Sequence, residues 1–376
     1  MATGKNKKTL EICEFNTKMN VRMIYYHRKQ FPGLAMIQEL PQISPKILRA
    51  LESKGFSANA TWALAGSAGS GRKYFRVSEG EKTAILQTNA SANEDFEHFV
   101  SYGKSFSDFN LPTPAIWAVD DSFAQVLMQD MGENTLFSVV VKDGELLPAN
   151  VRILYPATID ALIEWQEASQ KFFLSRADIA ARRFDYDALK WETDYFRTNY
   201  LQKKMGLTEI PQAVENFFST LACMVDTHPK VLMHRDFQSQ NVMVCHDSEI
   251  GFVDFQGARR GTMFYDIASL LWDPYVSLPE EMVKDFFDDW YNGYARCKES
   301  FDKDEAWTLF LQASLQRLMQ ALGAFCFLSM EKKIASFEKH IEPGKKRLLR
   351  VLELYEPLSP SRHEAITFLK KSLVQL

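Results

Sequence analysis

The sequence lacks the patterns that mark several classes of protein. Its five cysteines are odd in number, scattered and free of C-x-x-C spacing, which argues against a disulfide framework and against a zinc site. The formal net charge is only −4, so the composition gives no general case for nucleic-acid binding. We therefore expect a protein of the reducing cytoplasm without a nucleic-acid partner.

Long hydrophobic runs are absent as well. The most apolar stretch, residues 307–330, is interrupted by glutamines and by Arg317. Its uncharged part, Leu318–Met330, is shorter than the ~20 residues that a membrane-spanning helix needs. We expect a buried helix here and no membrane partner.

The first forty residues have no apolar run either. Seven lysines and arginines occur within the first thirty residues, without the continuous hydrophobic core of a secretory signal. We interpret residues 1–45 as a basic N-terminal extension outside the folded core.

The most informative segment that is present runs from Val231 to Tyr275. It contains His234-Arg235-Asp236 followed by Asn241, and short apolar runs flank this H-R-D-x-x-x-x-N loop. Phosphoryl transfer needs a carboxylate that accepts the proton of the acceptor hydroxyl, and oxygen ligands that hold Mg²⁺. Asp236 suits the catalytic role and Asn241 the metal-binding role.

A second apolar run, residues 250–253, ends in Asp254-Phe255-Gln256, thirteen residues after Asn241. This is the place of a D-F-G metal loop, so we expect Asp254 to be the main Mg²⁺ ligand. Taken singly, each residue also has a structural interpretation, such as a turn, a helix cap or a core histidine. Their types, spacing and strand contexts together favour a kinase that uses ATP and Mg²⁺.

The substrate of such a kinase should be small. Only eleven residues separate Asp254 from Asp266, and no A-P-E-like sequence follows, which leaves no room for a long peptide-docking activation loop. Asp266 precedes the apolar residues 267–272 and is expected to cap a helix there.

The segment resembles the aminoglycoside phosphotransferase superfamily, distant relatives of eukaryotic protein kinases that act on small molecules. Within it, the greatest similarity is to the bacterial kinases that phosphorylate N-acetylmuramate and N-acetylglucosamine at the anomeric hydroxyl. The motifs that carry it are R-D-F-Q-S-Q-N, D-F-Q-G-A-R-R-G, Y-D-I-A-S-L-L and W-D-P-Y, within a similarity over about residues 46–330. The resemblance implies structural roles for His234, Arg235 and Asp266, the last of which would steady the catalytic loop.

Upstream, the strand-like residues 62–65 and 74–77 enclose a Gly/Ser-rich turn whose backbone N–H groups could approach phosphates. The candidate nucleotide contacts in this turn are Gly66, Gly69, Ser70 and Gly71.

The third strand, residues 83–87, departs from the general kinase pattern. Gln87 stands where a lysine should contact the α- and β-phosphates. Lys82, Arg72 and Arg76 are candidates to replace that charge, although each could simply be a solvated strand residue. The departure also leaves open a pseudokinase that binds a nucleotide or a partner protein without turnover.

Further nucleotide contacts are expected around the next helix and strand. Residues 91–94 have the pattern of a capping box, which leaves Glu97 as the helix glutamate that reaches the nucleotide. Residues 125–132 predict a strand that enters a hinge, where adenine would lie near Gln129 and Met131.

Acceptor contacts should come from the amphipathic helical segments 157–171, 186–201 and 280–294, or from residues near them. A sugar presents an apolar face and hydroxyls that need partners, so aromatic residues beside carboxylates are the candidates. These substrate-binding candidates are Trp165, Glu192, Tyr195 and Asp273.

Together these observations predict an α+β, protein-kinase-like bilobal fold, with a small antiparallel N-lobe at residues 46–132 and a helical C-lobe at residues 133–376. The expected activity is Mg²⁺- and ATP-dependent phosphorylation of a sugar, most strongly an N-acetylated amino sugar in cell-wall recycling. The alternatives are a kinase for an aminoglycoside or a choline-like alcohol, and the pseudokinase. An acidic acceptor pocket would favour the cationic substrates, and a basic residue there would favour N-acetylmuramate.

Overall fold

The computed structural model describes residues 41–67, 72–245, 248–295 and 302–374. It divides the chain into two compact units, Met1–Met131 and Gly132–Leu376. The expected N-terminal extension lies almost wholly outside the described residues.

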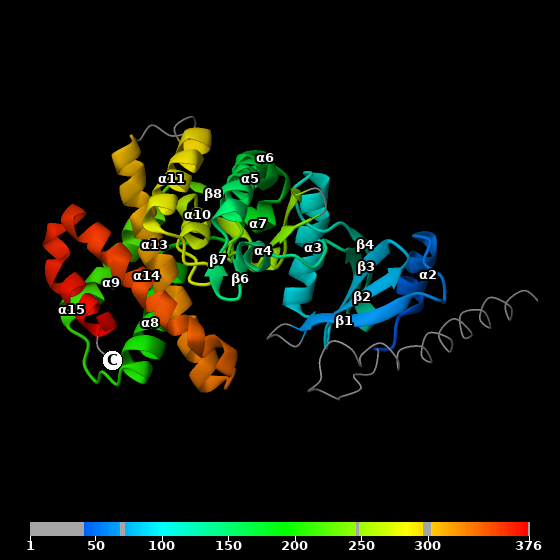
Figure 1. The fold of residues 1–376 in the computed structure, drawn as a ribbon, viewed down its shortest axis with the longest axis horizontal. Helices are drawn as coiled ribbons and strands as arrows, with labels where there is room; N and C mark the ends of the chain where they lie inside the picture. Colours follow the sequence, from blue (N-terminus) through cyan, green and yellow to red (C-terminus); the bar gives the residue numbers. More distant parts are fainter. Residues whose placement is uncertain (1–40, 68–71, 246–247, 296–301, 375–376) are drawn as a thin grey trace, which may run out of the picture. The chain divides into compact units, whose positions relative to one another are not determined.

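The N-terminal unit is a five-stranded antiparallel sheet in the order β1-β2-β3-β5-β4, with α2 and α3 on opposite sides of it (Figure 1). Its elements are α2 (Pro45–Ser53), β1 (Thr61–Ser67), β2 (Lys73–Glu79), β3 (Lys82–Thr88), α3 (Glu94–Asp108), β4 (Ile116–Asp120), η1 (Asp121–Phe123) and β5 (Gln125–Gln129).

Alternation along the strands gives this sheet its two faces. Phe75 and Val77 of β2 and Ala84 and Leu86 of β3 are buried in one apolar cluster with side chains of α2. The residues between them therefore project from the other face, on the side of α3.

The start of α3 differs from the expected capping box at residues 91–94. Asn93 is the N-cap, and its side chain accepts a hydrogen bond from the backbone N–H of Phe96 at 3.1 Å. Asn93 is itself among the preferred N-cap residues, so the helix begins at Glu94 without a contribution from Ser91.

The C-terminal unit is mainly helical, with three two-stranded ribbons. Its first half contains α4 (Leu136–Val140), β6 (Val141–Lys142), β7 (Glu145–Leu146), α5 (Pro148–Glu167), α6 (Ser169–Ser175), α7 (Ala177–Ala181), α8 (Tyr186–Phe196), the π-helical turn η2 (Arg197–Lys204) and α9 (Gln212–Thr227). Its second half contains β8 (Lys230–Met233), β9 (Val242–Val244), β10 (Ile250–Phe252), η4 (Phe255–Gly257), β11 (Arg259–Thr262), α10 (Phe264–Leu271), α11 (Glu280–Trp290), η5 (Tyr291–Ala295), α13 (Lys303–Cys326), η6 (Phe327–Glu331), η7 (Ala335–His340), α14 (Ile341–Tyr355), η8 (Glu356–Leu358), η9 (Pro360–Arg362) and α15 (His363–Val374).

Helix α13 is the buried helix that the apolar stretch predicts. It packs against α8, α9, α10 and α14, and most of its side chains are buried (Figure 1). No described helix combines the length and apolar character that crossing a membrane requires.

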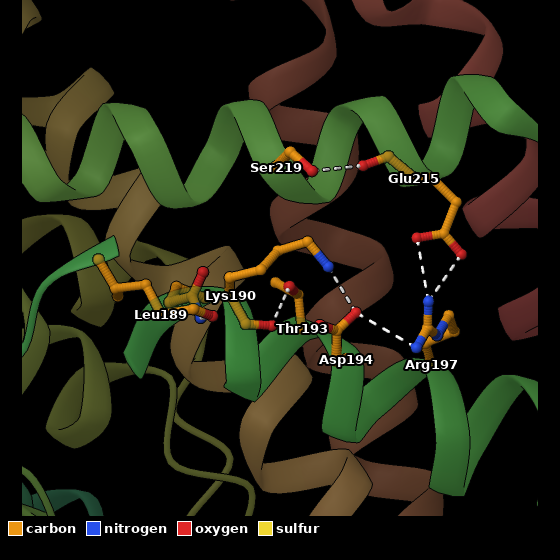
Figure 2. Close-up of polar contacts among 8 residues, drawn as sticks. Leu189, Lys190, Thr193, Asp194, Arg197, Glu215 and Ser219 are labelled. Atoms are coloured by element: carbon orange, nitrogen blue, oxygen red, sulfur yellow. Dashed lines mark hydrogen bonds and ion pairs between the residues drawn. The ribbon is translucent and has the colours of Figure 1, made fainter. Parts of the chain in front are cut away.

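Helices α8 and α9 are joined by a chain of charges at their outer edge (Figure 2). Lys190 donates to Asp194, Asp194 lies 3.5 Å from Arg197 Nη2, and Arg197 Nη1 donates to Glu215 Oε1 at 3.1 Å. These contacts lie on one face of α8, and the opposite face carries Glu192, described next.

Candidate active site

The two residues expected to hold a metal ion lie at one end of a β-ribbon. Strands β9 and β10 pair antiparallel with Val242 opposite Phe252, and the carbonyl of Asn241 accepts the N–H of Val253 at 3.0 Å. Asn241 and Asp254 are therefore brought together by backbone pairing. Asp254 has a left-handed backbone (φ +63°), and its Oδ1 accepts a hydrogen bond from Gln256 Nε2 at 2.8 Å.

Asp236 is held through its main chain. Its carbonyl accepts hydrogen bonds from Gln238 N at 3.0 Å and from Asn241 Nδ2 at 2.9 Å. Gly257 lies beside its carboxylate, since a Cβ at position 257 would stand 3.4 Å from Asp236 Oδ2. The expected base and the expected metal ligand are thus linked by a direct hydrogen bond.

Asp266 anchors the backbone of the catalytic loop. Its carboxylate accepts the backbone N–H groups of His234 at 2.7 Å and Arg235 at 2.9 Å. Burial raises the pKa of this carboxyl to about 7. It is not the N-cap that the sequence predicts, because α10 begins two residues earlier at Phe264, but the bonds support the steadying role.

His234 is a core residue. Its ring packs against Trp165 at a centroid distance of 5.8 Å and against Phe237 and Phe252, and burial lowers its pKa. Trp165 is completely buried behind it. The expectation that Trp165 contacts a substrate is therefore not supported, because its ring forms the packing beneath the catalytic loop.

Arg235 links this loop to its charged neighbours. Its backbone is left-handed (φ +80°), and its guanidinium lies 6.0 Å from the ring centroid of Phe184. Burial opposes its charge, but Asp236 and Glu192 outweigh that effect and raise its pKa. Arg235 is thus a charged structural residue, consistent with the resemblance.

A cavity of about 220 Å³ in the C-terminal unit reaches Asp236. It is lined by Asp236, Gln238, Ala268, Ser269, Trp272, Asp273, Pro274, Tyr275, Arg317, Leu318, Gln320, Ala321, Ala324, Phe325, Leu328 and Phe337. Aromatic, amide and charged side chains therefore converge beside the expected catalytic carboxylate.

Asp273 is the expected acceptor contact that the structure brings to this cavity. Its carboxylate also accepts the N–H groups of Ser239 at 2.8 Å and Tyr275 at 2.9 Å, and burial raises its pKa. Asp273 therefore fixes the far end of the catalytic loop while it lines the cavity.

Arg317 of α13 is the cation in the cavity wall, and the sequence analysis did not assign it to the site. Nε donates to Ser269 Oγ at 3.0 Å, Nη2 donates to Gln238 Oε1 at 3.4 Å, and Nη1 donates to Gln320. Burial disfavours its charge, but nearby Tyr265, Asp236, Glu192 and Asp273 raise its pKa. The sequence feature that could have pointed to Arg317 is its position as a charged residue within the apolar stretch 307–330.

Glu192 and Tyr195 of α8 do not line the cavity. Glu192 is buried and accepts hydrogen bonds from Tyr265 Oη at 2.9 Å and Gln316 Nε2 at 3.2 Å, and burial raises its pKa to about 7. Tyr195 stacks on the half-exposed ring of Trp191 at a centroid distance of 4.9 Å. Neither position supports the expected direct contact with an acceptor.

The glycine-rich turn of the N-terminal unit is described only in part. Gly66 lies in β1 next to a register shift, and Gly69, Ser70 and Gly71 lie outside the described residues. Met131 is the last residue of this unit and is partly buried.

The other nucleotide candidates have defined places in this unit. Lys82 donates to the carbonyl of Gly55 at 3.0 Å, and Gln129 Oε1 accepts from Ala115 N at 3.2 Å. Glu97 is exposed in the first turn of α3. The acid of α3 that meets a sheet cation is Asp95, which lies 3.6 Å from the buried Arg72.

Within the described ranges, no group of three or more His, Cys, Asp or Glu side chains could hold a metal ion by itself. Mg²⁺ on a nucleotide needs only one or two protein oxygens, because the phosphates and water supply the others. Asp254 and Asn241, whose amide nitrogen is engaged with Asp236, offer oxygen atoms of this kind at one end of the ribbon. The donor set therefore fits Mg²⁺.

Comparison with known proteins agrees with this geometry. Residues 61–299 match the model of the phosphotransferase enzyme family. The N-acetylmuramate/N-acetylglucosamine kinase of Pseudomonas aeruginosa is 28% identical over 224 residues, 58% of this chain and 62% of that enzyme, so the match spans less than two thirds of the relative. The kinase of the same name from Neisseria meningitidis is 27% identical over 77% of this chain and 85% of its own length.

A solved structure shares the fold at a much lower sequence identity. The choline kinase of Streptococcus pneumoniae superimposes with a TM-score of 0.53, at 11% identity, over 82% of this chain and 97% of its own. The likeness agrees with the predicted α+β, protein-kinase-like fold of two lobes. The family model matches more than half of the chain, so the chain belongs to the phosphotransferase enzyme family.

Proposed function

We propose that this protein transfers the γ-phosphoryl group of ATP to the anomeric hydroxyl of an N-acetylated amino sugar, N-acetylmuramate or N-acetylglucosamine. The observation that carries the proposal is the cavity beside Asp236, with Arg317 in its wall. Its volume of about 220 Å³ is below the ~300 Å³ at which pockets for drug-sized ligands begin, which suits a monosaccharide. The names of the relatives point to the same substrates.

The proposed mechanism uses residues that the fold already orders. Asp236 orients the acceptor hydroxyl and accepts its proton, because it lines the cavity while its carbonyl is bonded within the loop. Asn241 and Asp254 would hold Mg²⁺, which neutralises charge on the transferring phosphate. Asp266 and Asp273 keep the loop in place through backbone N–H groups.

The walls of the cavity suit a sugar with a carboxylate. Trp272, Tyr275 and Phe325 offer apolar surface for a sugar ring, and the amides of Gln238 and Gln320 can pair with hydroxyls. Arg317 can bind a carboxylate through its planar guanidinium, which favours N-acetylmuramate.

The pseudokinase alternative rests on Gln87. Against it, Asp236, Asn241 and Asp254 are all present and connected by hydrogen bonds and strand pairing. We expect the enzyme to act in the cytoplasm, where ATP is available and the exposed thiol of Cys223 stays reduced.

The test is Mg²⁺-dependent ATP turnover with N-acetylmuramate, N-acetylglucosamine, glucose, kanamycin and choline as acceptors. Asp236→Asn should abolish turnover, while the same change at Asp143, an exposed residue of the β6–β7 turn, should leave it unchanged. Loss of turnover with EDTA and its return with Mg²⁺ would support the metal assignment. Turnover on choline or kanamycin alone, or nucleotide binding without turnover on any acceptor, would refute the proposal.

A further inference from the structure

The missing lysine of the third strand has a counterpart elsewhere on the sheet. This inference rests on the proposed function, because it concerns the site that binds the phosphates of ATP. Gln87 occupies the lysine position and is completely buried. Its Nε2 donates to Asn89 Oδ1 at 2.8 Å, whereas its Oε1 is buried and accepts no hydrogen bond from the described residues.

Two of the three candidate cations are poorly placed to replace the lysine. Lys82 begins β3, five residues before Gln87, so alternation puts the two side chains on opposite faces of the sheet. Arg76 shares the face of Gln87 but is engaged by Asp130, which accepts from its Nε at 2.6 Å and its Nη2 at 3.1 Å.

Arg72 is better placed. Tyr74 lies opposite Gln87 in the β2–β3 pairing, and Arg72 immediately precedes β2; its contact with Asp95 of α3 places it on the side of the sheet that Gln87 faces. The Arg72 residue is only 7% exposed, and its Nη1 lies 3.6 Å from Asp95 Oδ2 in the first turn of α3. This face is the one on the side of α3 (Figure 1).

The contact between Arg72 and Asp95 resembles an ion pair that functions in protein kinases. In protein kinases the strand lysine pairs with an acid on the helix that follows the third strand. Here α3 follows β3, and Asp95 of α3 meets a cation from the residue immediately before β2 instead. A lysine at position 87 would add a further cation to the side that already carries Arg72 and Arg76, which explains why a neutral amide suits that position.

We propose that Arg72 is the residue that binds the α- and β-phosphates of the nucleotide, with Asp95 as the acid that positions it. The planar guanidinium can donate two hydrogen bonds to phosphate oxygens, which a lysine cannot do in the same geometry. Gln87 then contributes a neutral amide where the general pattern has the cation.

The experiment measures binding of Mg²⁺-ADP and of adenosine by calorimetry, without any acceptor. Arg72→Gln should weaken ADP binding roughly 10- to 100-fold, the loss expected for a charge-assisted hydrogen bond, and leave adenosine binding unchanged. Restoring a cation in the double variant Arg72→Gln/Gln87→Lys should recover at least part of the ADP affinity. Lys73→Gln, a change at the neighbouring exposed residue on the other face, is the matched control and should match the wild type.

Equal ADP affinity of Arg72→Gln and wild type would overturn the proposal, and so would an equal loss for ADP and adenosine. If Arg72→Gln does not fold, Asp95→Asn provides the second test, and it should weaken ADP binding but not adenosine binding. Because no acceptor is present, failure of all sugars to be phosphorylated would remove the proposed function while leaving this result intact.

Discussion

Helix α8 has charged side chains on two faces, and the two sets differ in how far they are exposed to solvent. On the outer face, Figure 2 shows Lys190 and Asp194 in contact with Arg197 of η2 and Glu215 of the neighbouring α9. These side chains are 20–34% exposed. On the inner face, Glu192 is buried among Tyr265 and Gln316 and interacts with the buried Arg317 and the partly buried Arg235.

The difference shows which charges serve the site. Exposed ion pairs contribute about 0–1 kcal/mol, since water already solvates both partners. Burying a charged side chain costs several kcal/mol of folding free energy unless hydrogen bonds or opposite charges compensate for the lost water. A buried charged residue is therefore expected where it positions a neighbouring part of the structure. The inner cluster, defined as Glu192, Arg235, Asp266, Asp273 and Arg317, borders the catalytic loop and the cavity.

The largest effect should follow removal of Asp266 from the inner cluster. Asp266→Ala leaves the N–H groups of His234 and Arg235 without their acceptor, so the free energy of unfolding should fall by about 2–5 kcal/mol. Urea unfolding measures this change. Asp266→Asn keeps one acceptor oxygen and should lose less; an Ala variant as stable as the wild type would contradict the role of Asp266.

A change at Arg317 should alter the choice of acceptor. Arg317→Gln should lower kcat/KM for N-acetylmuramate roughly 10- to 100-fold relative to N-acetylglucosamine, since only the former offers a carboxylate to the guanidinium. Steady-state kinetics on both sugars gives the ratio. Equal losses for the two sugars would show that Arg317 supports the cavity without binding the substrate carboxylate.

Glu192 should make stability depend on pH. Its folded pKa of about 7 lies above the ordinary value of 4.5, so the stability it contributes is complete below about pH 4.5 and is lost as the pH rises through 7. Glu192→Gln should therefore match the wild type at pH 4.5 and exceed it by roughly 1–3 kcal/mol at pH 8.

Asp266 is shifted in the same direction, so the informative quantity is the difference between variant and wild type at each pH. Chemical unfolding at several pH values provides it. A Gln variant that is less stable than the wild type at pH 8 would show that Arg235 and Arg317 need the charge of Glu192.

The smallest effect is expected on the outer face. Asp194→Asn should change the free energy of unfolding by less than about 1 kcal/mol, shrinking further at high salt, and should leave kcat unchanged. Unfolding at low and high salt, with Glu192→Gln as the inner-face counterpart, measures the contrast. A loss of activity in Asp194→Asn would show that charges on the outer face also serve the site, which would contradict the proposed difference between the two faces.

Local sequence patterns predicted much of the fold. Residues 231–233, 242–244 and 250–253 predicted strands, and the structure has β8, β9 and β10 there, which confirms the expected context of the catalytic loop. The apolar stretch 307–330 predicted a buried helix, and α13 confirms it. These patterns are local, so a single sequence contains them.

The acceptor side could not be predicted in the same way. Trp165 and Glu192 have the composition of sugar contacts, but burial depends on packing between distant segments. Arg317 reaches the cavity because α13 packs against α10, a pairing that no spacing in the sequence encodes. The pairing of Asp95 rather than Glu97 with Arg72 depends likewise on the rotation of α3 against the sheet.

The way in which Asp266 and Asp273 hold the catalytic loop affects how freely its sequence can vary. Both carboxylates bind main-chain N–H groups, at positions 234, 235, 239 and 275, and every amino acid except proline supplies such a group. These four bonds therefore do not depend on which side chains stand at those positions. New acceptor preferences can arise by substitutions in the cavity wall while the frame that carries Asp236 stays the same, and proline at these four positions is the change that removes a bond of that frame directly.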